Sequence, residues 1–175
     1  MKLALLATIA CLSVALPGAA RAGVSLEATI GSQRLGVTRA PGSGEALQPM
    51  GDYGAALLLK GGPVELGVAS EGTFLRGSLD RFNASALAGV AADLPVLRLE
   101  LLGELGFANL RTRNELEDAA AGDPRWERFV GVRPGLTAKL PLVPFRVGVW
   151  GLARWGLPGT SGAAYGLLGR VAIDF

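Results

Sequence analysis

The sequence predicts an all-β fold, an eight-stranded antiparallel up-and-down transmembrane β-barrel. Three observations lead to this prediction: apolar and polar residues alternate along eight segments, turn residues separate these segments, and the last segment alternates up to Phe175. Alternation at period two places successive side chains on opposite faces of a strand. The 26 glycines and 10 prolines are spread along the chain, which disfavours long helices.

The last segment shows the alternation most clearly. Leu167, Val171 and Phe175 share one face, whereas Arg170 and Asp174 share the other. The same split recurs along seven earlier segments, although it is weakest along residues 82–92. The eight expected strands are residues 24–30, 52–60, 64–71, 82–92, 97–107, 127–139, 145–155 and 164–175.

The connections between these segments alternate in length. Short turns that contain Pro or Gly are expected near residues 61–63, 93–95 and 140–144. Longer loops are expected at residues 32–50, 72–81, 109–125 and 156–163. Bacterial membrane barrels have short periplasmic turns and longer outer loops, and an even strand number places both chain ends on the side of the short turns.

Aromatic residues fall near the two ends of the expected strands, where membrane barrels carry their aromatic girdles. The inner ends have Phe145 and Phe175. The outer ends have Tyr53, Phe82, Phe107, Trp126, Trp155 and Tyr165.

The competing interpretation is a soluble periplasmic all-β binding protein of the lipocalin-like kind. Such a protein would show the same alternation, with its apolar face turned inward. However, several expected strands have about ten residues or more, which exceeds the usual five or six of soluble strands and suits tilted membrane strands. The face opposite the apolar one is also rich in Gly and Ala, which suits a narrow lumen better than a hydrated surface.

Residues 1–22 are expected to be a cleaved signal peptide, and residues 23–175 the barrel domain. Lys2 precedes a short apolar run, and Ala20-Arg21-Ala22 has the small-x-small pattern of a cleavage site. The alternative is a lipoprotein signal that uses Cys11, but the residues before it lack the usual leucine.

Cleavage at this site would change the composition of the mature chain. It would remove Cys11, the single cysteine, and two of the 17 basic residues, which leaves 15 basic against 15 acidic residues. No charge excess then remains to attract nucleic acid.

Residues 169–175 resemble the C-terminal strand of bacterial outer-membrane β-barrel proteins. The expected architecture is similar to that of the small OmpA- and OmpX-type eight-stranded barrels. This resemblance implies insertion in the bacterial outer membrane, contact with its lipid and lipopolysaccharide, and recognition of Phe175 as an assembly signal by the barrel-assembly machinery.

An eight-stranded barrel is just wide enough for side chains to fill its interior. Buried charges are tolerated when they are paired, so we expect a cross-barrel ion-pair network that plugs the lumen. A narrow channel for small solutes, opened by rearranging these pairs, is the alternative. The expected members of the network are Glu27, Glu65, Glu100, Glu104, Arg98, Arg133 and Arg170. Four more charges should lie nearer the inner rim: Lys60, Lys139, Arg146 and Asp174.

Enzymatic activity is not expected. Some barrels of the resembling group are lipases, acyltransferases, deacylases or proteases, and their chemistry generally uses histidine, which this sequence lacks. Glu100 and Glu104 lie roughly 13 Å apart along one strand, too far for a two-carboxylate glycosidase site. No phosphate-binding loop, dinucleotide fingerprint or metal-spaced cluster is present in the sequence. We therefore expect no cofactor or metal, and a structural role or one exercised through the outer loops.

The outer rim is expected to be basic, with Arg76, Arg81, Arg111, Arg113, Arg125 and Arg128. Guanidinium groups suit bidentate contact with phosphate. Arg81 and Arg128 are therefore candidates for contact with lipopolysaccharide.

Overall fold

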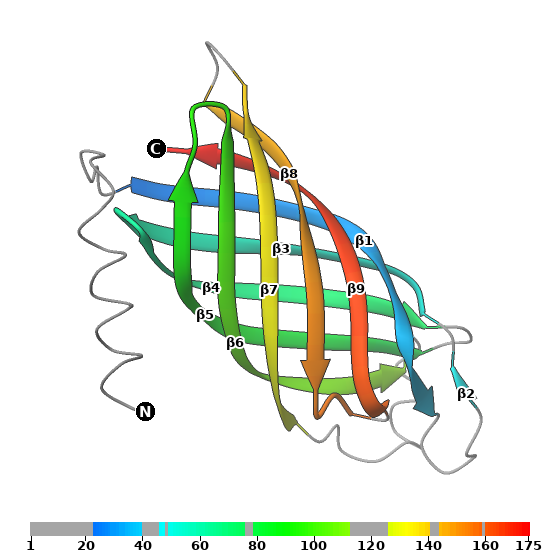
Figure 1. Cartoon of the computed structure of the whole chain (residues 1–175). Helices are drawn as coiled ribbons and strands as arrows, with labels where there is room; N and C mark the ends of the chain where they lie inside the picture. Colours follow the sequence, from blue (N-terminus) through cyan, green and yellow to red (C-terminus); the bar gives the residue numbers. More distant parts are fainter. Residues whose placement is uncertain are drawn as a thin grey trace, which may run out of the picture.

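The structure is a computed structural model of the whole chain, and it describes residues 23–39, 46–47, 49–75, 79–112, 126–140, 144–158 and 160–175. These residues form nine strands (Figure 1): β1 (Gly23–Arg39), β2 (Ala46–Leu47), β3 (Pro49–Gly61), β4 (Val64–Leu75), β5 (Leu79–Asp93), β6 (Leu97–Thr112), β7 (Glu127–Lys139), β8 (Phe145–Trp155) and β9 (Thr160–Asp174). The described part of the chain contains no helix long and apolar enough to cross a membrane.

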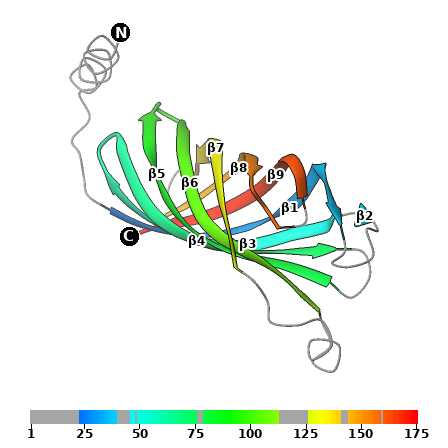
Figure 2. The same cartoon turned by 90° about the horizontal axis from the view of Figure 1, so that it is seen from below.

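Eight long strands close into a ring in the order β1-β3-β4-β5-β6-β7-β8-β9, and β9 pairs again with β1. Every neighbouring pair is antiparallel. The strands curve around a common interior (Figure 2). The two-residue β2 only extends the pairing at the end of β1, where Thr38 lies opposite Leu47. The structure therefore confirms the predicted up-and-down barrel.

The start of β1 and the end of β9 lie together at one end of the barrel (Figure 1). There Phe175 donates its backbone N–H to the carbonyl oxygen of Val24 at 2.9 Å. We call this the near end; it also carries the links β3–β4, β5–β6 and β7–β8. The opposite, far end carries the remaining links.

The strands are inverted relative to those of a soluble barrel, because apolar side chains point outward and charged ones point inward. On β6, Leu101 and Leu105 are 55% and 61% exposed, whereas Glu104 between them is 5% exposed. Exposing large apolar side chains to water costs roughly 25 cal/mol per Å², so this surface is suited to lipid. The lipocalin-like alternative requires the opposite arrangement.

Aromatic rings gather outside the barrel at the far end. Tyr53 stacks on Phe74, with ring centroids 4.7 Å apart, and Phe82 meets Trp126 edge to face at 6.3 Å. All four rings are on the exposed surface, which is the placement that interfacial aromatic residues favour.

The strands extend further toward the far end than the sequence predicted. β1 continues to Arg39, and its pairing with β9 has irregularities between Gln33 and Leu35 and between Leu35 and Val37. The link between β4 and β5 is only residues 76–78, because Thr73 pairs with Arg81. The predicted long loop at residues 72–81 is therefore wrong, since this link is as short as residues 94–96 at the near end.

Placing a charge on the outer surface should destabilise the barrel in proportion to its depth in the membrane. We expect Leu105→Arg, at the middle of β6, to lower the free energy of unfolding in lipid vesicles by about 2–4 kcal/mol. The matched control Val24→Arg, at the near end, should cost at most about 1 kcal/mol. Urea titration followed by gel mobility measures both values, and equal costs would contradict a lipid-facing surface.

Candidate functional site: the charged lumen

The inward side chains of the middle strands form what we call the central cluster, Glu71, Glu104, Arg133 and Arg154. Each guanidinium bridges both carboxylates. Arg133 lies 2.5 Å from Glu71 and also pairs with Glu104, while Arg154 Nε lies 2.8 Å from Glu104 Oε2 and its Nη2 pairs with Glu71. All four residues are at most 5% exposed, and their charges cancel.

Glycine and an aromatic ring shape the space around this cluster. Gly131 lies between Glu104 and Arg154 in the sheet register. A Cβ atom at Gly131 would lie 3.0 Å from Arg154 Cγ and 3.1 Å from Glu104 Oε2, so a larger residue would crowd the ion pair. Phe129 lies beside the cluster, with the guanidinium carbon of Arg154 5.4 Å from its ring centroid.

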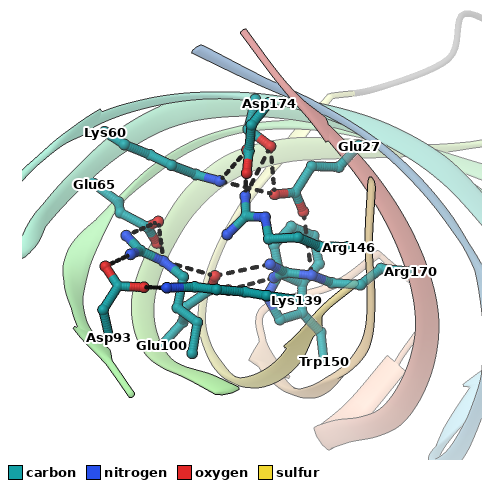
Figure 3. Close-up of polar contacts among 12 residues, drawn as sticks. Glu27, Lys60, Glu65, Asp93, Glu100, Lys139, Arg146, Trp150, Arg170 and Asp174 are labelled. Carbon is teal, nitrogen blue, oxygen red and sulfur yellow. Dashed lines mark hydrogen bonds and ion pairs between the residues drawn. The ribbon is translucent and has the colours of Figure 1, made fainter. Parts of the chain in front are cut away.

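A second group lies nearer the end that holds the chain termini, and we call it the inner cluster (Figure 3). Its members are Glu27, Glu65, Arg98, Glu100 and Arg170. Glu100 is at its centre. Arg170 Nη2 donates to Glu100 Oε1 at 2.8 Å, and Arg98 Nε lies 3.3 Å from the same oxygen. The two arginines also reach the flanking carboxylates, because Arg98 pairs with Glu65 at 2.7 Å and Arg170 with Glu27 at 3.4 Å.

Trp150 packs into the lumen between the two clusters. Its indole Nε1 donates to Glu100 Oε2 at 3.2 Å. The guanidinium carbons of Arg170 and Arg133 lie 4.3 and 5.3 Å from its ring centroid, within the range of a cation–π contact. Gly135 makes room for the ring, since a Cβ atom there would lie 2.6 Å from Trp150 Cδ1.

A rim of charges closes the network at the near end (Figure 3). Asp174 forms ion pairs with Lys60 at 3.0 Å and with Arg146 at 2.6 Å. Asp93 receives Lys139 at 2.7 Å and also pairs with Arg98. The rim is thereby joined to the inner cluster.

The charges of the two clusters and the rim balance among the described residues. Seven carboxylates take part, and they are Glu27, Glu65, Glu71, Asp93, Glu100, Glu104 and Asp174. Seven cations face them, and they are Lys60, Arg98, Arg133, Lys139, Arg146, Arg154 and Arg170. The two clusters and the rim are thus densely charged and together neutral.

Several of these pairs span the barrel. In the ring of eight strands, β4 and β8 are four positions apart and therefore opposite each other. Glu71 and Arg154 join these two strands directly, and Arg133 joins β7 to β4. Apolar side chains fill the remaining space around these struts, and they are Ala56, Leu58, Ala69, Leu87, Leu102, Leu152 and Leu168.

All seven residues expected in the ion-pair network lie inside the barrel, at most 5% exposed, and the structure brings them into the two clusters. Glu71 and Arg154 were missed as members, although both lie on the inward parity of their strands. Trp150 was also missed, because an aromatic residue on the inward face gives no sign in the sequence that it bonds to Glu100.

Arg81 does not lie where the sequence analysis placed it. It belongs to β5, is 1% exposed, and donates to Thr160 Oγ1 at 3.0 Å and to Gln33 Oε1 inside the barrel. The predicted contact of Arg81 with lipopolysaccharide is inconsistent with this burial. Its expected position in a loop depended on beginning this strand at residue 82, whereas the strand begins at Leu79.

Arg128 is exposed, and it pairs in register with Phe107 on the outer surface. Arg111 is also exposed, and its guanidinium lies 6.0 Å from the Trp126 ring centroid. The remaining predicted rim arginines, Arg76, Arg113 and Arg125, lie outside the described residues. The same holds for residues 1–22, so the signal peptide stays a prediction.

The described residues offer no site for a metal ion. No group of three His, Cys, Asp or Glu side chains is placed to hold a metal ion in that part of the chain. Glu100 and Glu104 belong to different clusters, and each is bonded to two arginines.

Solved barrel structures have a fold similar to that of this chain. Neisserial surface protein A superposes with a TM-score of 0.65 at 9% sequence identity, over 87% of this chain and 97% of that chain. The N-terminal β-barrel domain of Pseudomonas aeruginosa OprF superposes with a TM-score of 0.61 at 14% identity, over 89% of this chain and 100% of that chain. The fold is that of the small eight-stranded outer-membrane barrels. No protein-family model matches the sequence, and no curated protein matches it at a significant level.

Removing one member of the central cluster should unfold the barrel more easily. Arg154→Met leaves Glu71 and Glu104 each without one buried partner, and breaking a buried pair in this way costs about 3–5 kcal/mol. Arg128→Met removes an equivalent charge from the outer surface and should change stability by about 0.5 kcal/mol or less. Urea unfolding in vesicles compares the two variants. A similar loss of unfolding free energy in both would show that the cluster contributes no more to stability than an exposed charge does.

Proposed function

We propose that the protein is a non-enzymatic integral barrel of the bacterial outer membrane, with a lumen plugged by side chains. Its role is structural or exercised through its outer loops. The observation that carries this proposal is the inversion of the strands, with large apolar side chains outside and a neutral set of paired charges inside. A solvated barrel gains nothing from this arrangement, whereas a bilayer requires it.

The plug is supported by struts that cross the interior at two levels. Glu71 and Arg154 meet in the central cluster, and Glu100 and Arg170 meet in the inner cluster. Water-filled porin channels belong to wider barrels, whereas eight strands leave an interior that side chains fill. The absence of histidine from the sequence supports the non-enzymatic part.

Membrane fractionation and gel mobility test this proposal. The protein should separate with outer membranes, and unheated samples should migrate differently from boiled ones, because the closed barrel resists detergent. Fractionation with soluble periplasm and no effect of heating would instead support the lipocalin-like alternative.

The plug itself is tested by conductance in planar bilayers. We expect no reproducible unitary conductance from the natural protein, because the struts occupy the lumen. Reproducible steps that change on Glu100→Ala or Arg133→Ala would support the narrow channel instead. The matched control is Arg128→Ala, whose side chain lies outside the lumen.

Two partners belong to the same proposal. Arg128, exposed beside the outer aromatic residues, is suited to a lipopolysaccharide phosphate, and Arg128→Ala should reduce the lipopolysaccharide retained on purification.

Phe175, 77% exposed at the closing seam, is suited to recognition by the barrel-assembly machinery. Phe175→Ala should slow insertion in cells more than Phe145→Ala does; equal rates would remove this role.

A further inference from the structure

The near end of the barrel carries an exposed apolar surface, which we call the turn patch. Backbone hydrogen bonds fix its shape: Lys139 N–H donates to the carbonyl of Val96 at 2.9 Å, and the N–H of Leu94 donates to the carbonyl of Leu97 at 2.8 Å. The first bond ties the β5–β6 link to the end of β7, and the second closes the link itself; the ends of β5, β6 and β7 lie together in Figure 1. The patch consists of Leu94 (44% exposed), Val96 (64%), Leu140 (41%) and Phe145 (41%).

The charges beside the turn patch pair with one another. Lys139 and Arg98 both bond to Asp93, and Lys60 and Arg146 both bond to Asp174 (Figure 3). The patch therefore presents apolar side chains whose charged neighbours are already engaged. A polar protein partner would find few groups there to recognise, whereas lipid needs only the apolar surface.

The turn patch occupies one side of the near end. On the other side, the end of β3 and the β3–β4 link have the sequence Gly61-Gly62-Pro63, which has no large apolar side chain. Gly61 is exposed, and a Cβ atom there would meet nothing within 4 Å. The two sides of the same barrel end therefore differ in the apolar surface of their links, although Leu59 and Val64 are exposed on the strands beside Gly61.

The patch also continues the outer apolar surface. Leu99, Leu136 and Val147 are exposed near the adjoining ends of β6, β7 and β8, and Leu99 pairs directly with Leu136. Apolar side chains thus run without interruption from the membrane-facing strands past their ends. A patch that is continuous with a lipid-facing surface is suited to the same medium.

We propose that the turn patch is buried in the lipid interface of the near-end leaflet, so that the barrel is anchored more deeply on its β5–β8 side than at the β3–β4 link. This inference rests on the proposed insertion of the barrel in a bilayer. Apolar side chains of interfacial segments reach about 5–10 Å into the boundary between headgroups and acyl chains, and the turn patch should reach a similar depth.

Fluorescent labels at single cysteines test the proposed depth. In the full chain, Cys11→Ser removes the single natural cysteine, and Val96→Cys, Gly61→Cys and Leu101→Cys then each provide one labelling site. The proteins are reconstituted in phosphatidylethanolamine and phosphatidylglycerol vesicles without any other protein. Quenching by nitroxide-labelled lipids reports depth, and quenching by aqueous iodide reports contact with water.

The label at position 96 should be quenched by lipid nitroxides at a depth of about 5–10 Å below the headgroups, whereas the label at position 61 should be quenched by iodide. The label at position 101 reports insertion itself, and its exposure to iodide would reject the proposed function. If position 101 is shielded but position 96 is as open to iodide as position 61, the turn-patch inference is wrong and a protein becomes the better occupant.

A charge placed in the patch provides a second measurement. With a label at Leu140→Cys, the further change Val96→Asp should move the label toward water, whereas Gly61→Asp should leave its depth unchanged. Heat-modifiable gel mobility shows that each variant is still folded. An unchanged label depth in the folded Val96→Asp variant would overturn the inference.

Discussion

Neutrality of the lumen is the constraint on which this structure depends. A carboxylate or guanidinium alone in a space too narrow for bulk water would be strongly unfavourable. Glu71 and Glu104 are tolerated because two arginines bond to both of them, and Glu100 because Arg98, Arg170 and Trp150 surround it. The outside of each strand can then be largely apolar, because the charged side chains of the two clusters and the rim pair with one another inside the barrel.

Closure of the ring supports this neutrality. The pairing of β1 with β9 brings Arg170 beside Thr29, and so places its guanidinium between Glu27 and Glu100. Closure also removes the free edges that an open sheet would expose in a bilayer. The network and the ring are therefore formed by the same backbone register, and neither is complete without the other.

The sequence predicted the strands and their faces well, because alternation is a local property. It failed where alternation fails. The far part of β1 was missed because irregular pairing around Leu35 interrupts period two, and the end of β4 was missed because Leu75 points inward.

The membership of the lumen was predicted in large part, but its pairing was not. Parity places Glu104 and Arg133 inside, yet which charges meet depends on the stagger between strands distant in sequence. Glu71 and Arg154 are 83 residues apart and touch only because β4 and β8 face each other across the closed ring. Arg81 was misplaced for a related reason: the expected strand began at residue 82 instead of Leu79, and this difference separates an expected surface cation from a buried side chain.

The strut between Glu71 and Arg154 has a consequence for how such a barrel diverges. Replacing one member leaves an unbalanced charge on the opposite wall, so an accepted change there calls for a second change many residues away. Exchanging the glutamate and the arginine between the two strands would restore an ion pair in the same space. Outside, any apolar side chain serves nearly as well as another. The fold therefore constrains the pairing of charges inside and the alternation of apolar residues along each strand, rather than the identity of each residue. Two barrels can accordingly have one architecture while sharing as few as 9% of their residues.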